Sequence, residues 1–255
     1  MRLGIVTYDI AKDWDLLTMI RVCEDVGLQG VELRTTHAHG VETALNPEER
    51  NRVRNTFEDS SVELVGLGSV FEYHSPDPKV LQENINGTKE YVRLAADVGA
   101  RGVKVRPNDL PDEIPLEQSI EQIGLALREV SGFAEHYKIK IRLEVHGRRS
   151  AHVPYIRRML DIANHDNLYV CWNSNLAEVE NGSIERNFNL LGDKIDLVHM
   201  NELYLENYPW RELFWLLKES GFEGFTLAEI PGCHDVGAAT RLLKYYKALW
   251  LELNR

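Results

Sequence analysis

The chain has 255 residues, of which 40 are acidic and 29 are basic, so its formal net charge is -11. A negative surface repels the phosphate backbone, and general nucleic-acid binding is therefore not expected. No apolar run reaches the roughly 18 residues that a membrane-spanning helix needs, so membrane insertion is not expected either.

The three cysteines, Cys23, Cys171 and Cys233, are far apart and form no CxxC pair. This spacing argues against a disulfide framework or a cysteine zinc site and predicts reduced thiols. Residues 1–7 have the pattern of a strand and lack the charged and then apolar segments of a signal peptide. We therefore expect a cytoplasmic protein.

Eight short apolar runs follow one another along the chain. They are rich in Val, Ile and Leu, which is typical of strands covered on both faces in a parallel sheet. The predicted strands are residues 3–7, 30–34, 62–68, 102–106, 140–146, 168–173, 195–200 and 224–230.

Segments with helical spacing separate these runs. Asn46 followed by Pro47 predicts the start of one helix, and Gly27, Gly99 and Gly221 stand where left-handed caps would end three others. The predicted helices are residues 14–26, 47–59, 80–98, 116–137, 154–163, 184–191, 210–220 and 238–253.

The regular alternation predicts one (β/α)8 TIM barrel, in which residues 1–255 form a single domain. A doubly wound open sheet is the alternative, but its units seldom repeat so evenly. No GxGxxG follows the first strand, so a dinucleotide site is not predicted. In a TIM barrel, binding and catalytic side chains gather where the strands end.

Alternating polarity indicates which side chains face the interior of the barrel. Arg142, Glu144 and His146 alternate with Leu143 and Val145, and the apolar pair should face the helices. The same reasoning turns inward Glu32, Arg34, Lys104, Arg106, Asn173, His199 and Glu229.

The inward charges have two interpretations. Buried charges need partners, so a structural ion-pair network could join Glu32, Arg34, Lys104 and Arg142. Alternatively, Lys104 and Arg106 could hold a carboxylate, phosphate or hydroxyl group of a substrate.

Four inward residues lie at the ends of successive late strands. Intervals of 29, 26 and 30 residues separate Glu144, Asn173, His199 and Glu229. Because each interval is close to one barrel unit, these side chains should converge. Two carboxylates, an imidazole and an amide can hold a divalent cation, and the set suits Mn²⁺, Mg²⁺, Co²⁺ or Zn²⁺.

Two histidines complete the predicted site. His146 is expected to contact the substrate or to support the metal ligands from behind. His74 follows the third strand and should reach the barrel mouth, where loops often carry binding residues. Together with Lys104 and Arg106, they form the predicted substrate-binding set.

Short motifs at these strand ends resemble a known family. Leu-Glu-Val-His at 143–146, Val-His-Met-Asn-Glu at 198–202 and Leu-Ala-Glu at 227–229 are similar to the metal-binding strand ends of the xylose-isomerase-like sugar phosphate isomerase/epimerase superfamily. Residues 71–78 and 94–100 also resemble that group, so the resemblance covers nearly the whole chain.

The resemblance implies a metal held by Glu, Asp, His and Glu. Glu144, His199 and Glu229 match this pattern, whereas Asn173 stands at the Asp position. A His often follows three residues after that Asp, and here the position is Leu176. An amide oxygen brings no charge, so the metal should bind more weakly than at a site with three carboxylates.

The resemblance also implies an activity, the metal-dependent isomerisation or epimerisation of a keto sugar or polyol derivative in carbohydrate metabolism. The metal would polarise the carbonyl and stabilise an enediolate. Glu144 and Glu229 would serve as general base and general acid. Barrels of this type commonly pair, so a homodimer is a further expectation.

Three alternatives stay open. A polyol-ketone dehydratase needs the same enolate stabilisation. A non-catalytic carbohydrate-binding barrel without metal is favoured by Asn173 and Leu176. An apurinic-site endonuclease is disfavoured, because that chemistry uses several metals and more His and Asp ligands, and because the net charge is -11.

Overall fold

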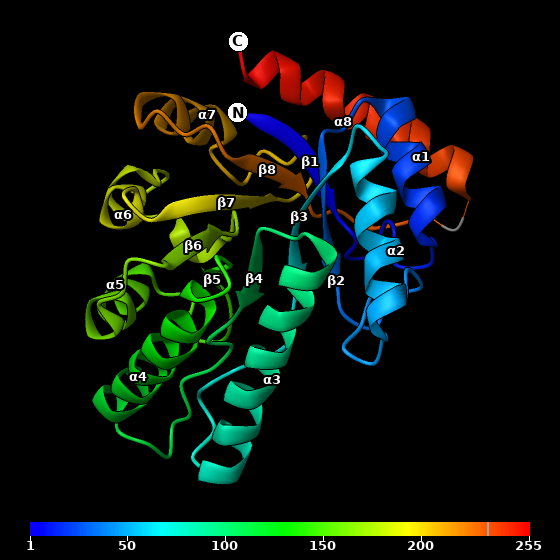
Figure 1. Ribbon diagram of the computed structural model, residues 1–255. Helices are drawn as coiled ribbons and strands as arrows, with labels where there is room; N and C mark the ends of the chain where they lie inside the picture. The colour runs from blue at the N-terminus through cyan, green and yellow to red at the C-terminus, as the bar shows by residue number, and fades with distance from the viewer. Residues whose placement is uncertain (234) are drawn as a thin grey trace.

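Eight parallel strands form a closed barrel in chain order in the computed structural model, which describes residues 1–233 and 235–255 (Figure 1). The strands are β1 (Arg2–Val6), β2 (Gly30–Arg34), β3 (Glu63–Gly68), β4 (Gly102–Val105), β5 (Lys140–Glu144), β6 (Leu168–Trp172), β7 (Ile195–Met200) and β8 (Phe225–Ala228). The first and last strands close the ring, since Arg2 lies opposite Phe225 and Ile5 opposite Ala228. The predicted TIM barrel is confirmed.

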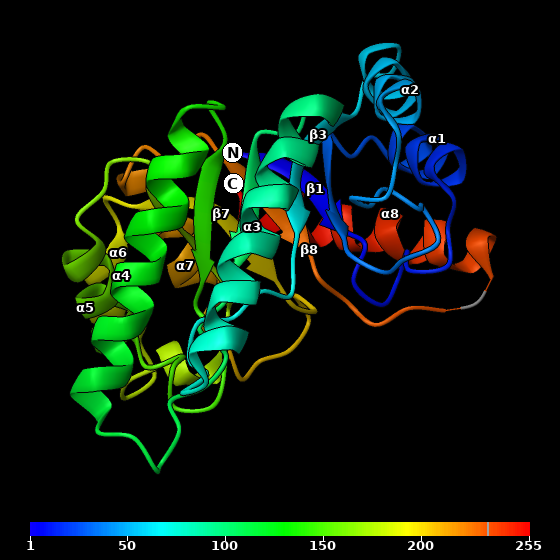
Figure 2. The same cartoon turned by 60° about the horizontal axis from the view of Figure 1, so that its bottom comes forward.

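The helices surround the barrel, as Figures 1 and 2 show from two directions. They are α1 (Leu16–Val26), α2 (Pro47–Glu58), α3 (Pro78–Val98), α4 (Leu116–Glu135), α5 (Val153–Ala163), α6 (Glu185–Leu191), α7 (Trp210–Glu219) and α8 (Val236–Leu253), with a short 3₁₀ helix η1 (Leu176–Glu178) between β6 and α6. The helix α2 begins at Pro47 as predicted, and Asn46 and Glu49 form a capping box at its start. No helix of residues 1–233 and 235–255 is long and apolar enough to cross a membrane.

The main apolar core lies between the strands and the helices. Leu143 belongs to this layer and is fully buried, which agrees with its predicted outward direction. A second, smaller apolar cluster consists of Val6, Val65, Cys171, Leu197, Phe225 and Leu227. The three cysteines are free thiols, as predicted.

Arg142 has a structural partner inside the barrel. Its Nε donates to Asp196 Oδ2 at 2.7 Å, and its Nη1 donates to the Val65 carbonyl at 2.8 Å. Gly102 and Gly66 leave room for this guanidinium, because a Cβ on Gly66 would come within 2.8 Å of Nη1. Asp196 thus balances the charge of Arg142.

Strands β5, β6 and β8 end one or two residues earlier than the sequence predicts. His146 lies two residues beyond β5, and Asn173 and Glu229 each lie one residue beyond β6 and β8. Apolar residues such as Val145 and Ile230 continue the strand pattern, although the backbone has already left the barrel. These three polar residues therefore stand on the first turns of the loops, at the C-terminal mouth.

Candidate active site

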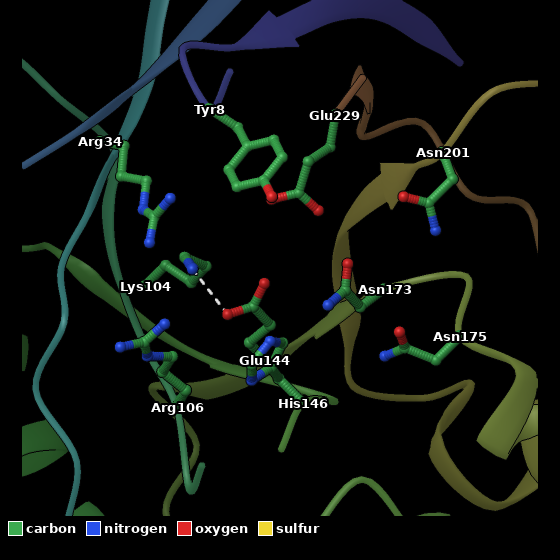
Figure 3. A pocket seen from close by; sticks show the side chains of 10 residues that line it. All are labelled: Tyr8, Arg34, Lys104, Arg106, Glu144, His146, Asn173, Asn175, Asn201 and Glu229. Atoms are coloured by element: carbon green, nitrogen blue, oxygen red, sulfur yellow. Dashed lines mark hydrogen bonds and ion pairs between the residues drawn. The ribbon is translucent and has the colours of Figure 1, made fainter. Parts of the chain in front are cut away.

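A cavity of about 200 Å³ opens at the C-terminal ends of the strands. Every side chain that lines it can form hydrogen bonds: Tyr8, Arg34, Lys104, Arg106, Glu144, His146, Asn173, Asn175, Asn201 and Glu229 (Figure 3). An all-polar lining suits a small ligand rich in hydroxyl or charged groups better than an apolar one.

Glu144, His199 and Glu229 meet at the base of this site. Glu144 ends β5, His199 lies on β7, and Glu229 follows β8. One ligand atom from each lies within 4.8 Å of the other two. His199 Nδ1 is 3.4 Å from Glu144 Oε1 and 3.5 Å from Glu229 Oε2. The three residues that the sequence analysis places together are therefore neighbours in the structure.

Glu32 supports His199 from the opposite side of the imidazole ring. His199 Nε2 lies 3.2 Å from Glu32 Oε1, and both side chains are fully buried. Two glycines of β3 make room for this carboxylate, since a Cβ on Gly68 would lie 3.0 Å from Glu32 Oε1 and one on Gly66 would lie 3.5 Å from Oε2. A carboxylate at Nε2 favours the tautomer that leaves Nδ1 free to act as a ligand.

The donor set fits a divalent cation. Neither ring nitrogen of His199 makes a hydrogen bond with another described residue, although both are buried. Burial disfavours the imidazolium, but Cys171 and the Glu229 and Glu32 carboxylates outweigh it and raise the pKa of His199 well above 6.5, so a cation would bind Nδ1 by displacing a proton. A cation at Nδ1 would meet two carboxylates, which supply the charge that a divalent ion requires.

Asn173 faces the same cavity from the end of β6 (Figure 3). Its side-chain oxygen can complete the ligand set with Glu144, His199 and Glu229, as the sequence analysis proposes. The amide is neutral, so a cation here would be balanced by two carboxylates instead of three.

Lys104 forms an ion pair with the candidate ligand Glu144. Its Nζ donates to Glu144 Oε2 at 2.6 Å, and less than a tenth of either side chain is exposed. Burial works against both charges, but their attraction prevails, so the pKa of Glu144 falls well below its usual value and that of Lys104 rises above its own. Glu144 is consequently ionised at neutral pH, with Oε2 held by Lys104 and Oε1 directed to His199.

The other predicted binding residues separate into two groups. His146 and Arg106 line the central cavity, and the buried Nδ1 of His146 makes no hydrogen bond with the described residues. Burial lowers the pKa of His146, which favours its neutral form. His74 instead borders an adjoining cavity that shares His146 and Asn175, and its Nδ1 lies 3.0 Å from the Pro107 carbonyl.

Three lining residues were missed at the sequence level as members of the site. Tyr8 stands shortly after β1, and Asn175 and Asn201 follow β6 and β7. Their common signal is a polar residue just beyond a strand, which is too frequent in loops to select them. Their orientation depends on loop contacts, such as the bond from Asn175 Nδ2 to the Val145 carbonyl at 2.7 Å.

Comparison with known proteins identifies the family of the chain. A profile described as "Xylose isomerase-like TIM barrel" matches residues 20–249. The chain belongs to this family. No curated protein sequence matches it.

Several solved structures share the fold of this xylose isomerase-like barrel. D-psicose 3-epimerase from Clostridium cellulolyticum H10, crystallised with D-tagatose, has a TM-score of 0.79 and 16% identity, covering 100% of this chain and 98% of its own. The IOLI protein with a bound zinc atom has a TM-score of 0.79 and 18% identity, with 100% and 98% covered. The 3-keto-D-glucoside 4-epimerase YcjR from E. coli has a TM-score of 0.80 and 14% identity, with 99% of each chain covered.

This xylose isomerase-like barrel departs at two positions, Asn173 and Leu176, from the ligand pattern that its sequence resembles. Both positions lie in the segment after β6. Leu176 is 59% exposed and borders side cavities instead of the central one. Ser174 adopts a left-handed backbone with φ 45° between the two asparagines of the cavity. The Ser174 carbonyl accepts a hydrogen bond from Asn201 Nδ2 at 3.2 Å, which ties this loop to the end of β7.

A buried acid lies beneath the same loop. Glu178 accepts hydrogen bonds from Tyr208 Oη at 2.7 Å and from the backbone N–H of Asn173 at 3.3 Å. Trp172 donates to Tyr208 Oη at 2.8 Å and its ring contacts that of Phe188 on α6, so its indole is part of the helix-side packing. Burial raises the pKa of Glu178 to about 8. Glu178 therefore supports Asn173 mainly as a neutral acid.

Proposed function

We propose that this protein is a metal-dependent isomerase or epimerase that moves a proton next to the carbonyl of a keto sugar or polyol derivative. The observation that carries the proposal is the meeting of Glu144 and Glu229 at His199 Nδ1, at 3.4 Å and 3.5 Å. Two carboxylates on different sides of one polar cavity are suited to remove a proton and to return one.

Residues of this chain would hold the ion and the substrate. Glu144, Asn173, His199 and Glu229 would bind the cation, with Glu32 orienting His199. When bound, the ion would polarise the carbonyl and offset the charge of an enediolate. The hydroxyl groups of a sugar would find partners in Tyr8, Asn175 and Asn201, which line the same cavity.

The proton would pass between the substrate carbon and the two carboxylates. Glu144 is ionised and its Oε2 is held by Lys104, so Oε1, beside the cation site, would be the oxygen that accepts a proton. Glu229 reaches the cavity from β8, across the barrel mouth from β5, and would return a proton to the other face of the carbon. Return to that face inverts the carbon and gives an epimer, whereas return to the neighbouring carbon gives an isomer.

The names of the similar structures agree with this chemistry. They include a D-psicose 3-epimerase bound to D-tagatose, a 3-keto-D-glucoside 4-epimerase and a protein with bound zinc. All three descriptions involve a keto sugar or a divalent metal, which are the two components that the residues of the cavity would accommodate.

The test is proton exchange in D₂O. Protein loaded with Mn²⁺ is incubated with D-fructose, D-tagatose, D-psicose and phosphorylated or acidic keto sugars, and products are followed by NMR. We expect deuterium next to the carbonyl together with a new epimer or isomer. Glu144→Gln and Glu229→Gln should each slow exchange about a hundredfold to ten-thousandfold.

Glu219→Gln provides the matched control, because Glu219 is an exposed carboxylate at the end of α7. It should exchange protons at the rate of the unmodified protein. A product that has lost water would contradict the isomerase activity and support the dehydratase activity instead. Absence of both exchange and bound metal would support the carbohydrate-binding barrel instead.

A further inference from the structure

Arg34 brings to the cavity a positive charge that is not paired with any carboxylate among the described residues. Its guanidinium makes no hydrogen bond or ion pair with another residue of 1–233 and 235–255. The guanidinium carbon lies over the ring of Tyr8, 5.3 Å from the ring centroid. Arg34 is only partly exposed and lines the central cavity. A structural ion pair therefore does not explain it.

Arg106 offers a second donor on the same side. One of its terminal nitrogens, Nη2, donates to Glu72 Oε1 at 2.7 Å. Its Nε is buried and has no hydrogen-bond partner among the described residues. A buried N–H group without a hydrogen-bond partner costs free energy. A ligand that accepts a hydrogen bond from this Nε would remove that cost and bind more tightly.

The strand register places the cations along one wall. Arg34 on β2 lies opposite Gly68 on β3, and Gly68 lies opposite Lys104 on β4. Because Gly68 has no side chain, no side chain of β3 separates Arg34 from Lys104 at this level of the sheet. Arg106 follows two residues after Lys104, and Figure 3 shows all three on the side of the cavity opposite Asn173, Asn175 and Asn201.

The charge balance of this wall is positive. Lys104 is matched by Glu144, and Arg106 is matched by Glu72. Among the described residues, Arg34 has no such carboxylate. A divalent ion held by Glu144 and Glu229 would also take up the charge of Glu144 that balances Lys104. An anionic group at Arg34 and Arg106 would restore the balance, and guanidinium groups bind carboxylate and phosphate through paired N–H donors.

We propose, building on the proposed function, that Arg34 and Arg106 form a subsite for an anionic group of the substrate, so that the preferred keto sugar carries a carboxylate or a phosphate. The polar wall opposite would hold the hydroxyl groups of the sugar. The acidic pair between the two walls would then face the carbonyl end of the molecule.

The experiment measures binding by isothermal titration calorimetry with three probes: D-fructose, D-fructose 6-phosphate and D-fructuronate. Measurements are made with Mn²⁺ and again after dialysis against EDTA, because an ion could itself attract an anion. Both anionic sugars, or one of them, should bind about ten- to a hundredfold more tightly than D-fructose in both conditions. Comparison of the two anions tells which group, phosphate or carboxylate, fits the subsite.

Three variants make the assignment specific. Arg34→Gln should remove most of the preference for the anionic sugars, and Arg34→Lys should keep part of it, because the charge remains while the paired donors are lost. Arg21→Gln, at an exposed arginine of α1, should leave all three affinities unchanged. Circular dichroism of each variant checks that the barrel is folded.

The outcomes separate this subsite from the proposed reaction. The subsite would be overturned if D-fructose and both anionic sugars bind with equal affinity. It would also be overturned if Arg34→Gln lowers the affinity for all three sugars equally, even if proton exchange occurs. A preference for an anion that depends on Arg34, without any proton exchange, would uphold the subsite and overturn the proposed reaction. If the preference for anionic sugars disappears after EDTA treatment, the bound metal ion attracts the anionic group, and the proposed role of the arginines is refuted.

Discussion

Replacement of Glu178 by Gln tests the buried acid beneath Asn173. The pKa of Glu178 is raised by burial to about 8, whereas the usual value is 4.5. Below pH 4.5 the carboxyl group is protonated in both the folded and the unfolded chain, so it contributes no pH dependence. Between pH 4.5 and 8 the unfolded chain releases this proton and the folded chain keeps it. The free energy of unfolding therefore falls as the pH rises through this range.

The size of the effect follows from the two pKa values. Each pKa unit corresponds to about 1.36 kcal/mol, so the full difference is about 5 kcal/mol, of which about 3 kcal/mol is reached by pH 7. Glu178→Gln has the shape of the neutral acid and does not titrate. The variant should consequently gain stability relative to the unmodified protein by these amounts as the pH rises from 4.5.

Urea unfolding followed by circular dichroism at pH 5, 6, 7 and 8 measures this difference directly. Glu83→Gln, at an exposed carboxylate on α3, is the matched control and should show an almost constant difference. All other titrating groups are common to the compared proteins and cancel. A stability difference between Glu178→Gln and the unmodified protein that does not change with pH would refute the idea of a buried neutral acid.

Three further substitutions test the site and its loops. Asn173→Asp should strengthen Mn²⁺ binding about tenfold or more in calorimetry, because a third carboxylate joins the ligands; an unchanged Kd would remove Asn173 from the ligand set. Glu32→Gln should weaken Mn²⁺ binding about 10- to 100-fold through the loss of the carboxylate behind His199, and an unchanged affinity would contradict that supporting role. Gly147→Ala should lower the free energy of unfolding by about 2 kcal/mol more than Gly182→Ala. Both glycines have positive φ, of 104° and 84°, but only at Gly147 would a Cβ meet backbone, 2.1 Å from the Asn108 carbonyl oxygen. Equal losses in chemical denaturation would show that this close approach is relieved at no cost.

The barrel could be predicted because its strands and helices obey simple periodic rules. The predicted strands at residues 30–34 and 195–200 match β2 and β7. The predicted strands that correspond to β5 and β8 extend too far, since apolar residues continue into the loops that carry His146 and Glu229. Hydrogen bonding to the neighbouring strand, which decides where a strand ends, is not visible in a single run of residues.

The centre of the candidate site was also predictable. Alternation along parallel strands turns Glu144 and His199 inward, and the barrel brings their ends together. The partner of each inward charge was harder to predict, because it depends on neighbours across the sheet. Glu32 was considered for an ion-pair network with Arg34, Lys104 and Arg142, whereas the structure places it against His199 in the space left by two glycines. Tyr8, Asn175 and Asn201 lie on loops, where no periodicity indicates a direction.

The four candidate ligands of the cation come from β5, from the residue after β6, from β7 and from the residue after β8, so they are brought together only when the barrel closes. An ion bound there would act as a reversible cross-link between distant segments and would bind the unfolded chain far more weakly. Bound ion would then appear as added thermal stability, about 2.7 kcal/mol at a hundred times the Kd. Melting curves recorded across a series of divalent salts could therefore rank metals for this protein before a substrate is identified.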